Sequence, residues 1–415
     1  MPESAKDCGI LRELARQVAE VAALPVHQET IRLWKRLNGL EKVRPLVWIN
    51  EICWDEMGPE MNLECADAFC RSLEWNLRAT LYQWRHLPGD MVVEGVLYSP
   101  VVVQDTGFGL GVHAKRPEGD VFGSADFEPI LKNESDLEKI KDPVVAVDGE
   151  ASERNYRRTA ELVGDILRVQ KCGLPYSWWA PWDVLCQYYG ITEMMIDMYE
   201  RPAFVHKAIG RMTDAMLALL DQWERLGVLA LNNTNVRVGA GGLGYTDELP
   251  QPDFDGRRVR PIDMWGSATP QIFSEVSPAM HEEFALQYEL KFLERYGLNC
   301  YGCCEPLHRK VDRLKKVPRL RRISMSPKAN VAEGAAAIGD RYIFSHKPNP
   351  AVLAWDHWDG DQARAELRSA LEKTRGCTVE IIMKDITTVR GDPRRLWEWS
   401  RIAMEEAERA GERPP

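Results

Sequence analysis

Residues 298–308 read Leu298-Asn-Cys-Tyr-Gly-Cys-Cys-Glu-Pro-Leu-His308, and this stretch decides the fold that the sequence predicts. It lies between two helical segments, one that ends at Gly297 and one that begins at Arg309. A short strand between two helices, with thiols and a carboxylate at its end, is where parallel α/β barrels place their chemistry. Because side chains alternate along a strand, we expect Tyr301, Cys303 and Glu305 to share a face.

The same order of strand and helix recurs along most of the chain. Candidate strands lie at 43–52, 91–104, 175–180, 228–232, 262–267, 298–304, 322–326, 341–346 and 378–384. Polar residues recur at their carboxyl ends, namely Glu51, Asn232, Ser267, Cys303, Ser326, His346 and Asp385. Short apolar strands that alternate with helices indicate a parallel sheet. The sequence therefore predicts the α/β class: a (β/α)8 TIM barrel over 43–415, preceded by an N-terminal helical extension over 1–42.

Composition narrows the class of protein. The chain has 415 residues, of which 45% are hydrophobic and 28% charged, and its net charge of −10 argues against a nucleic-acid-binding surface. The polar start of the chain and the lack of a long apolar run predict neither an export signal nor a membrane span. Ten cysteines without paired spacing indicate a reducing compartment, so we expect a cytoplasmic protein.

Residues 239–244 match the glycine spacing of a phosphate-binding loop. The residues that follow, Tyr245-Thr-Asp-Glu-Leu-Pro250, do not read as the helix that such a loop requires. We therefore expect a flexible lid or a tight turn at the rim of the barrel.

Aromatic residues are the second candidate for a site. The chain has fourteen tryptophans, and Trp178, Trp179 and Trp182 lie close together in sequence. With Trp54 and Trp265 they could form a wall for a methoxylated ring or a quaternary ammonium group. The alternative is that most of them belong to the core.

Four segments carry a resemblance to a known family. They are Arg44-Pro-Leu-Val-Trp48, residues 127–142, Ile191–His206 with Glu200-Arg-Pro202, and the turn Lys347-Pro-Asn-Pro350. Together they resemble the uroporphyrinogen decarboxylase superfamily, which includes the corrinoid-dependent methyltransferases. The resemblance runs from about Val43 to Ala410 and implies a (β/α)8 barrel with its active site at the carboxyl ends of the strands.

Two activities of that family can be compared with this chain. The decarboxylases carry an arginine-rich segment after the first strand, whereas this chain has the acidic Asn50-Glu-Ile-Cys-Trp-Asp-Glu56, which would repel a porphyrinogen polycarboxylate. The methyltransferases hold zinc through a His-x-Cys pair and a cysteine after the last strand. Here the positions are Tyr301-Gly-Cys303 and Asp385. A mixed zinc site of Cys303, Glu305, His346 (or His308) and Asp385 is one possibility and a metal-free site the other.

The resemblance implies a methyltransferase that moves a methyl group from a small O- or N-methyl substrate to a corrinoid carried by a partner protein. We expect Glu51, Tyr301, Glu305 and Asp385 to be catalytic, with zinc as the metal cofactor. The expected substrate-binding residues are Asn50, Trp54, Trp178, Trp179, Asn232 and Trp265. A decarboxylase of a small carboxylic acid and a non-catalytic barrel that binds a partner are the alternatives, and a homodimer is left open.

Overall fold

The core of the protein is a parallel sheet of seven strands, seen in a computed structural model that describes residues 4–115, 126–175 and 178–412. The order across the sheet is β1 (Leu46–Ile49), β13 (Thr378–Met383), β12 (Ile343–His346), β11 (Leu320–Met325), β10 (Leu298–Tyr301), β9 (Trp265–Ala268) and β8 (Trp178–Trp179). Its apolar inner strands are buried on both faces, as parallel strands covered by helices are. The predicted α/β class with a parallel sheet is confirmed.

Six further strands form three separate pairs. They are β2 (Val96–Pro100) with β7 (Arg168–Cys172) in parallel, and two antiparallel pairs, β3 (Val102–Asp105) with β6 (Val145–Asp148) and β4 (Ala114–Lys115) with β5 (Asp126–Phe127). Strand β7, which follows α4 (Gly149–Val163), is not among the strands that the sequence predicts. Arg168, Gln170 and Lys171 are exposed, so β7 lacks an apolar face that would mark it. Of the predicted strand 228–232, an isolated bridge from Leu229 to Leu174 is present.

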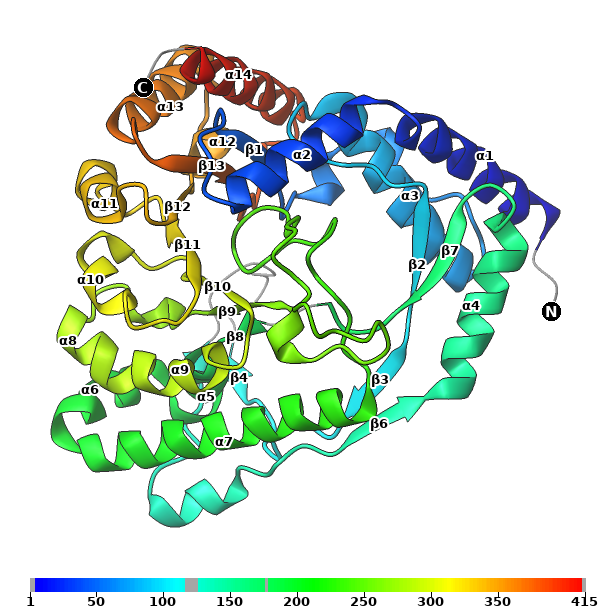
Figure 1. The fold of residues 1–415 in the computed structure, drawn as a ribbon. Helices are drawn as coiled ribbons and strands as arrows, with labels where there is room; N and C mark the ends of the chain where they lie inside the picture. The colour runs from blue at the N-terminus through cyan, green and yellow to red at the C-terminus, as the bar shows by residue number, and fades with distance from the viewer. Residues whose placement is uncertain (1–3, 116–125, 176–177, 413–415) are drawn as a thin grey trace.

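The helices that follow the strands lie on the outer side of the sheet (Figure 1). Their bounds are α3 (Ala68–His86), α5 (Pro181–Tyr189), α6 (Ile191–Glu200), α7 (Pro202–Leu226), α8 (Pro278–His281), α9 (Gln287–Leu293), α10 (Val311–Leu314), α11 (Val331–Ile338), α12 (Ala351–Ala354), α13 (Gly360–Lys373) and α14 (Arg394–Gly411). Within the described ranges, no helix is both long enough and apolar enough to cross a membrane.

Two helices precede the first strand, α1 (Ala5–Ala22) and α2 (Val26–Asn38). Helix α1 packs against α3, whereas side chains of α2 are buried in the interior. The indole of Trp34 is fully buried and donates to the carbonyl of Asp90 at 2.7 Å. The amide of Asn38 donates to the carbonyl oxygens of Leu243 and Tyr245 at 2.9 and 2.8 Å. Helix α2 is therefore part of the core.

The glycine loop 239–244 is not a lid, because its middle is buried beneath α2. A Cβ on Gly241 would lie 2.4 Å from Cδ of Arg322, and one on Gly242 would lie 2.3 Å from the Trp34 ring. The glycines are thus needed for close approach of the backbone to packed side chains. The alternative of a tight turn holds, since the Gly241 amide donates to the Val238 carbonyl at 3.0 Å.

A buried polar cluster lies next to this loop. Arg322 and Glu380 form an ion pair at 3.1 Å, and Glu380 also accepts from the amide of Gly242 and from the hydroxyl of Ser345. The ammonium of Lys347 donates to the same hydroxyl at 2.5 Å, and burial lowers the pKa of Lys347 to about 7. Glu380 pairs in register with Leu46, the first residue of β1, so this cluster lies below the carboxyl ends of the strands.

Candidate functional site

Two carboxyl groups meet where the neighbouring strands β1 and β13 end. Glu51 and Asp385 both have left-handed backbones, with φ of 52° and 57°. Such angles are uncommon outside glycine and cluster at functional sites. The Asp385 amide donates to Oε2 of Glu51 at 3.2 Å, and the Ile386 amide donates to the Glu51 carbonyl at the same distance. The two strand ends are therefore tied together with their carboxyl groups adjacent.

Two cations accompany these carboxyl groups. The Lys384 ammonium, 5% exposed, contacts Oδ2 of Asp385 and lies 3.4 Å from Oε2 of Glu51. It is also 3.9 Å from Sγ of Cys304. From the loop before the buried glycines, the Arg237 guanidinium donates to Oε1 of Glu51 at 2.7 Å.

Two thiols complete the group. Gly302, with φ of 91°, turns the chain after β10, and Sγ of Cys303 then lies 3.4 Å from Sγ of Cys304. Both cysteines are free thiols, and Sγ of Cys304 is 3.9 Å from Oδ2 of Asp385. We call Glu51, Arg237, Cys303, Cys304, Lys384 and Asp385 the strand-end cluster.

The two carboxyl groups titrate in opposite directions. Burial acts to raise the pKa of Glu51, but the contact with Asp385 and the charges of Arg237 and Lys384 outweigh it and lower the pKa to about 2. Burial, followed by the neighbouring Glu51, raises the pKa of Asp385 in spite of Lys384. A carboxyl pair whose environments separate their pKa values can supply one ionised group and one proton donor.

The pKa values of the two thiols are also shifted in opposite directions. The hydrogen bond between them lowers the pKa of Cys304, with help from the Lys384 charge and against burial. The same hydrogen bond, followed by burial, raises the pKa of Cys303. Burial acts to lower the pKa of Lys384, but the two sulfurs and Asp385 raise it, so this ammonium stays charged. Cys304 is therefore the sulfur that carries negative charge most readily.

Glu305 lies beneath the cluster and is fully buried. Its carboxylate accepts from the Thr269 hydroxyl at 2.9 and 3.0 Å and from the Cys303 amide at 2.9 Å. Burial, the largest influence, raises the pKa of Glu305. In this position Glu305 holds the turn that presents Cys303.

Tyr301 does not share a face with Cys303, because the chain turns at Gly302 between them. Its hydroxyl donates to Glu289 and lies 2.7 Å from Nε2 of His281, among the helices behind β10. The expectation that Tyr301 lines the catalytic site is therefore corrected. Desolvation raises the pKa of Glu289 to about 8 in this setting.

His346 also faces away from the cluster. Ser345 and Lys347 point to the buried polar cluster, so alternation along β12 turns His346 to the other face. There the centroid of its ring lies 6.3 Å from the centroid of the Phe344 ring. Together with residues of α11 and α13, His346 lines a cavity of about 450 Å³. His308 is on the helix side as well, 3.8 Å from Glu333.

The predicted zinc ligands therefore do not form a set that fits the ion. His346 points away, Glu305 is tied to Thr269 and the Cys303 amide, and the Lys384 ammonium lies among Glu51, Cys304 and Asp385, where zinc would have to bind. In the part of the chain that is described, no group of three or more His, Cys, Asp and Glu side chains is arranged to hold a metal ion. The positive charge next to these groups comes from Lys384 and Arg237.

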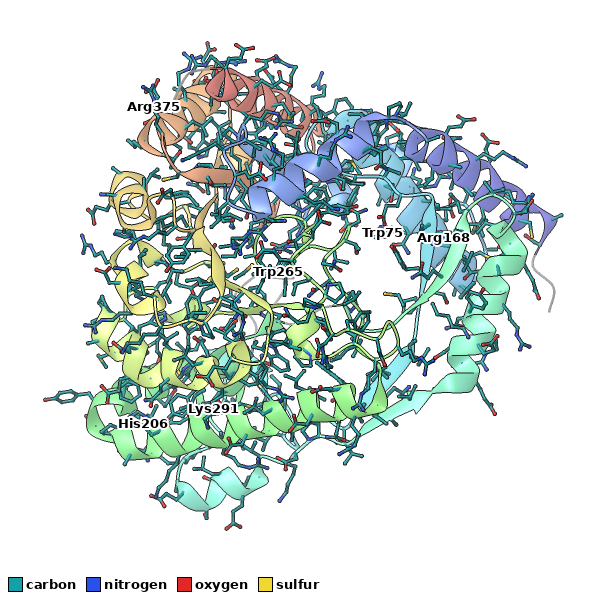
Figure 2. The ribbon with its side chains drawn as sticks, viewed as in Figure 1. Trp75, Arg168, His206, Trp265, Lys291 and Arg375 are labelled. Atoms are coloured by element: carbon teal, nitrogen blue, oxygen red, sulfur yellow. The ribbon has the colours of Figure 1, made fainter. Side chains whose placement is uncertain are left out.

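Three of the predicted substrate-binding residues are structural. Trp265 is fully buried at the start of β9, near the middle of the molecule (Figure 2), and its indole donates to the Gly244 carbonyl at 2.9 Å. Asn232 bonds the backbone of Trp265 through both side-chain atoms, at 2.8 and 2.9 Å. Trp179 stacks on Phe292 with 4.5 Å between ring centroids. These three side chains stabilise the core.

The other three predicted substrate-binding residues are half-buried. Asn50 is half-buried, and its backbone N–H donates to the Met383 carbonyl at 2.9 Å. Trp54 is half-buried in the short helix Trp54–Glu56 and meets Trp75 edge-on at 5.7 Å. Trp178, at the edge of the sheet, is half-buried on the opposite face from Trp179.

The sequence prediction missed part of the cluster. The residues expected for the site did not include Arg237, Cys304 or Lys384. A signal for Arg237 was its position shortly after the polar run Asn232-Asn-Thr-Asn235, which ends a predicted strand.

Neither a protein-family model nor the sequence of a curated protein matches this chain. Among solved structures, it is similar to a methyltransferase from Methanosarcina mazei, with a TM-score of 0.50 and 14% sequence identity. The match covers 90% of this chain and 97% of that chain. At this identity the likeness concerns the fold, and it extends over nearly the whole length of both proteins.

Proposed function

We propose that this chain is a methyltransferase that moves a methyl group from a small O- or N-methyl substrate to a corrinoid held by a partner protein. The observation that carries the proposal is the strand-end cluster, in which Asp385, Lys384 and Cys304 face one another after β13 and β10. The fold shared with a methyltransferase supports it. The proposal includes a (β/α)8-type ring, with the pair β2–β7 completing the arc of the seven-stranded sheet.

In this proposal Asp385 protonates the leaving group. Loss of a methyl group leaves an alkoxide, a phenoxide or an amine, and a positioned acid lowers the barrier to its departure. The raised pKa of Asp385 keeps its proton available at higher pH than an ordinary aspartate would. Lys384 stabilises developing negative charge from a site that is 5% exposed, where an ammonium acts more strongly than in water.

The remaining residues position these groups. Glu51, ionised and held by Arg237, keeps Asp385 in its left-handed turn. Trp54, Asn50 and Trp178 are the candidates to contact the substrate, by stacking or by hydrogen bonding. The corrinoid, when brought by its partner protein, supplies the nucleophile that accepts the methyl group.

A second candidate is the decarboxylation of a small carboxylic acid. The observation that favours it is the pair of cations, Arg237 and Lys384, on either side of Glu51. They could bind one carboxylate, and Asp385 could then protonate the carbanion left after loss of CO₂.

One experiment separates the two. The purified protein is mixed with a Co(I) corrinoid and a series of methoxyaromatics and methylamines, and methylcorrinoid is followed by its absorption spectrum. We expect a signal with at least one donor and a loss of about 10²–10⁴-fold in Asp385→Asn. Asp392→Asn, the same change at a loop residue paired with Arg394, is the control and should keep the wild-type rate.

If no donor gives methylcorrinoid while the protein alone releases CO₂ from small acids, the second candidate is correct. If neither product forms, the non-catalytic barrel that binds a partner is the remaining alternative.

A further inference from the structure

The sulfurs of the two consecutive cysteines in the strand-end cluster lie side by side. Neighbouring side chains on an extended chain point in opposite directions, so consecutive cysteines seldom bring their sulfurs together. Here the turn at Gly302 does so, and the sulfurs of Cys303 and Cys304 lie 3.4 Å apart as free thiols. Hydrogen bonds from the Ser324 hydroxyl to the Cys303 carbonyl, at 2.9 Å, and from the Cys303 amide to Glu305 fix this turn.

The separation of the sulfurs selects among thiophilic ions. Two-coordinate Cu(I) and Hg(II) prefer sulfurs on opposite sides of the ion, and zinc needs four ligands in a tetrahedron. A pyramidal As(III) centre takes sulfurs at a narrow angle, which leaves them nearly in contact. The geometry of Cys303 and Cys304 suits the last of these.

The surroundings favour the same ligand. Thiolates, not thiols, bind such a centre, and the Lys384 ammonium 3.9 Å from Sγ of Cys304 favours the thiolate. Cys304 is half-buried, so the pair can be reached from solvent, while Cys303 is 5% exposed. Oδ2 of Asp385, 3.9 Å from Sγ of Cys304, can accept a hydrogen bond from a hydroxyl group left on the bound arsenic.

We propose that Cys303 and Cys304 form a dithiol site for trivalent arsenic, taken up as arsenite. Two As–S bonds form and two As–O bonds of As(OH)₃ break, and the two thiol protons leave with the displaced hydroxides as two molecules of water. One hydroxyl stays on the arsenic, and neither sulfur nor arsenic changes its oxidation state. The site shares Cys304, Lys384 and Asp385 with the proposed catalytic site. Arsenite binding is measured without turnover, so the failure of one proposal can be told from the failure of the other.

The test is a titration of the whole reduced protein with sodium arsenite. Bound arsenic is measured after gel filtration, and alkylation followed by peptide mapping shows which cysteines become protected. We expect one arsenic per chain and protection of Cys303 and Cys304 together. Because two thiols on one chain bind as a chelate, Cys303→Ser and Cys304→Ser should each weaken binding by about 100-fold or more.

Cys377→Ser is the matched control, because Cys377 is also half-buried and its thiol contacts the Ala335 carbonyl, away from the cluster. It should bind arsenite like the wild type. Circular dichroism checks the fold of each variant, and if Cys303→Ser does not fold, the half-buried Cys304→Ser decides. Wild-type affinity in that variant, protection of other cysteines instead, or failure of the wild type to bind would overturn the proposal.

Discussion

At the scale of single residues, the most unusual feature is a nearly buried lysine in contact with two carboxyl groups and a thiol. Lys384 is nearly buried, yet it contacts Asp385, Glu51 and Cys304 at once. Glu51 and Asp385 are partly exposed, so Lys384 is the buried charge of the group, and removing either carboxylate leaves it with less compensation. The roles of these residues are therefore coupled, and a change in one should be seen at another.

The first prediction concerns the thiol of Cys304. Replacing Lys384 with Met removes the positive charge beside this sulfur, so less of it is thiolate at neutral pH. We expect alkylation of Cys304 by iodoacetamide to slow by about tenfold, measured by mass spectrometry of the peptide. Lys207→Met, at a surface lysine paired with Glu134, is the control and should leave the rate unchanged. An unchanged rate in Lys384→Met would show that this charge does not act on the thiol.

The second prediction concerns Glu289, whose buried carboxyl group bonds Tyr301. Burial raises its pKa to about 8 from an ordinary value of 4.5. The native state therefore keeps a proton that the unfolded chain has released, and this group makes stability fall as pH rises from about 4.5 to about 8. Glu289→Gln removes that dependence and should raise the free energy of unfolding by about 1–3 kcal/mol above pH 8.

Urea unfolding of wild type and Glu289→Gln across this pH range is the measurement. The lowered pKa of Lys347 acts on both proteins and in the opposite direction, so it cancels in their difference, which reports Glu289 together with its charge interaction with Lys310. A difference that does not change with pH would contradict the prediction.

At the scale of elements, apolar strands were predictable and polar ones were not. The strands near 298–304, 322–326, 341–346 and 378–384 all exist in the sheet, since continuous apolar runs mark buried parallel strands. The exposed β7 has no such run. Side-chain direction beyond a strand was not predictable either, because the turn at Gly302 separates Tyr301 from Cys303. For the same reason, the sequence did not predict that the glycine loop 239–244 turns into the interior.

The third prediction tests that loop. Gly242→Ala should lower the free energy of unfolding by about 1–3 kcal/mol, because the new Cβ meets the rigid, fully buried Trp34 ring. Gly9→Ala is the matched control: Gly9 lies within α1 with open space around it, so alanine should stabilise by about 0.5–1 kcal/mol. Chemical denaturation of the three proteins gives both values. Equal stability of Gly242→Ala and wild type would mean that the loop can move away from α2.

At the scale of the whole molecule, the N-terminal helices bear on where the folded unit begins. The sequence predicts a boundary near residue 42, because helical patterning gives way there to the first strand. A pattern of apolar positions does not reveal which helix fills the interior. In the structure Asn38 accepts a hydrogen bond from the buried Arg322 at 2.7 Å, and Arg321 pairs with Glu248 beside it. Helix α2 thus supplies one of the acceptors of a buried guanidinium of the sheet.

The last prediction follows from this arrangement. A chain without residues 1–23 loses α1, which packs on the outside against α3, and should unfold at a lower temperature but still in one transition. A chain without residues 1–40 also loses Trp34 and Asn38, which leaves Arg322 without one of its partners and opens a cavity beside Gly242. Loss of a buried tryptophan alone costs about 3–5 kcal/mol, a large part of the stability of a typical domain. We therefore expect the shorter chain to lose its cooperative transition in calorimetry. If it keeps one, the fold begins at β1 and the two helices are an extension, as the sequence predicts.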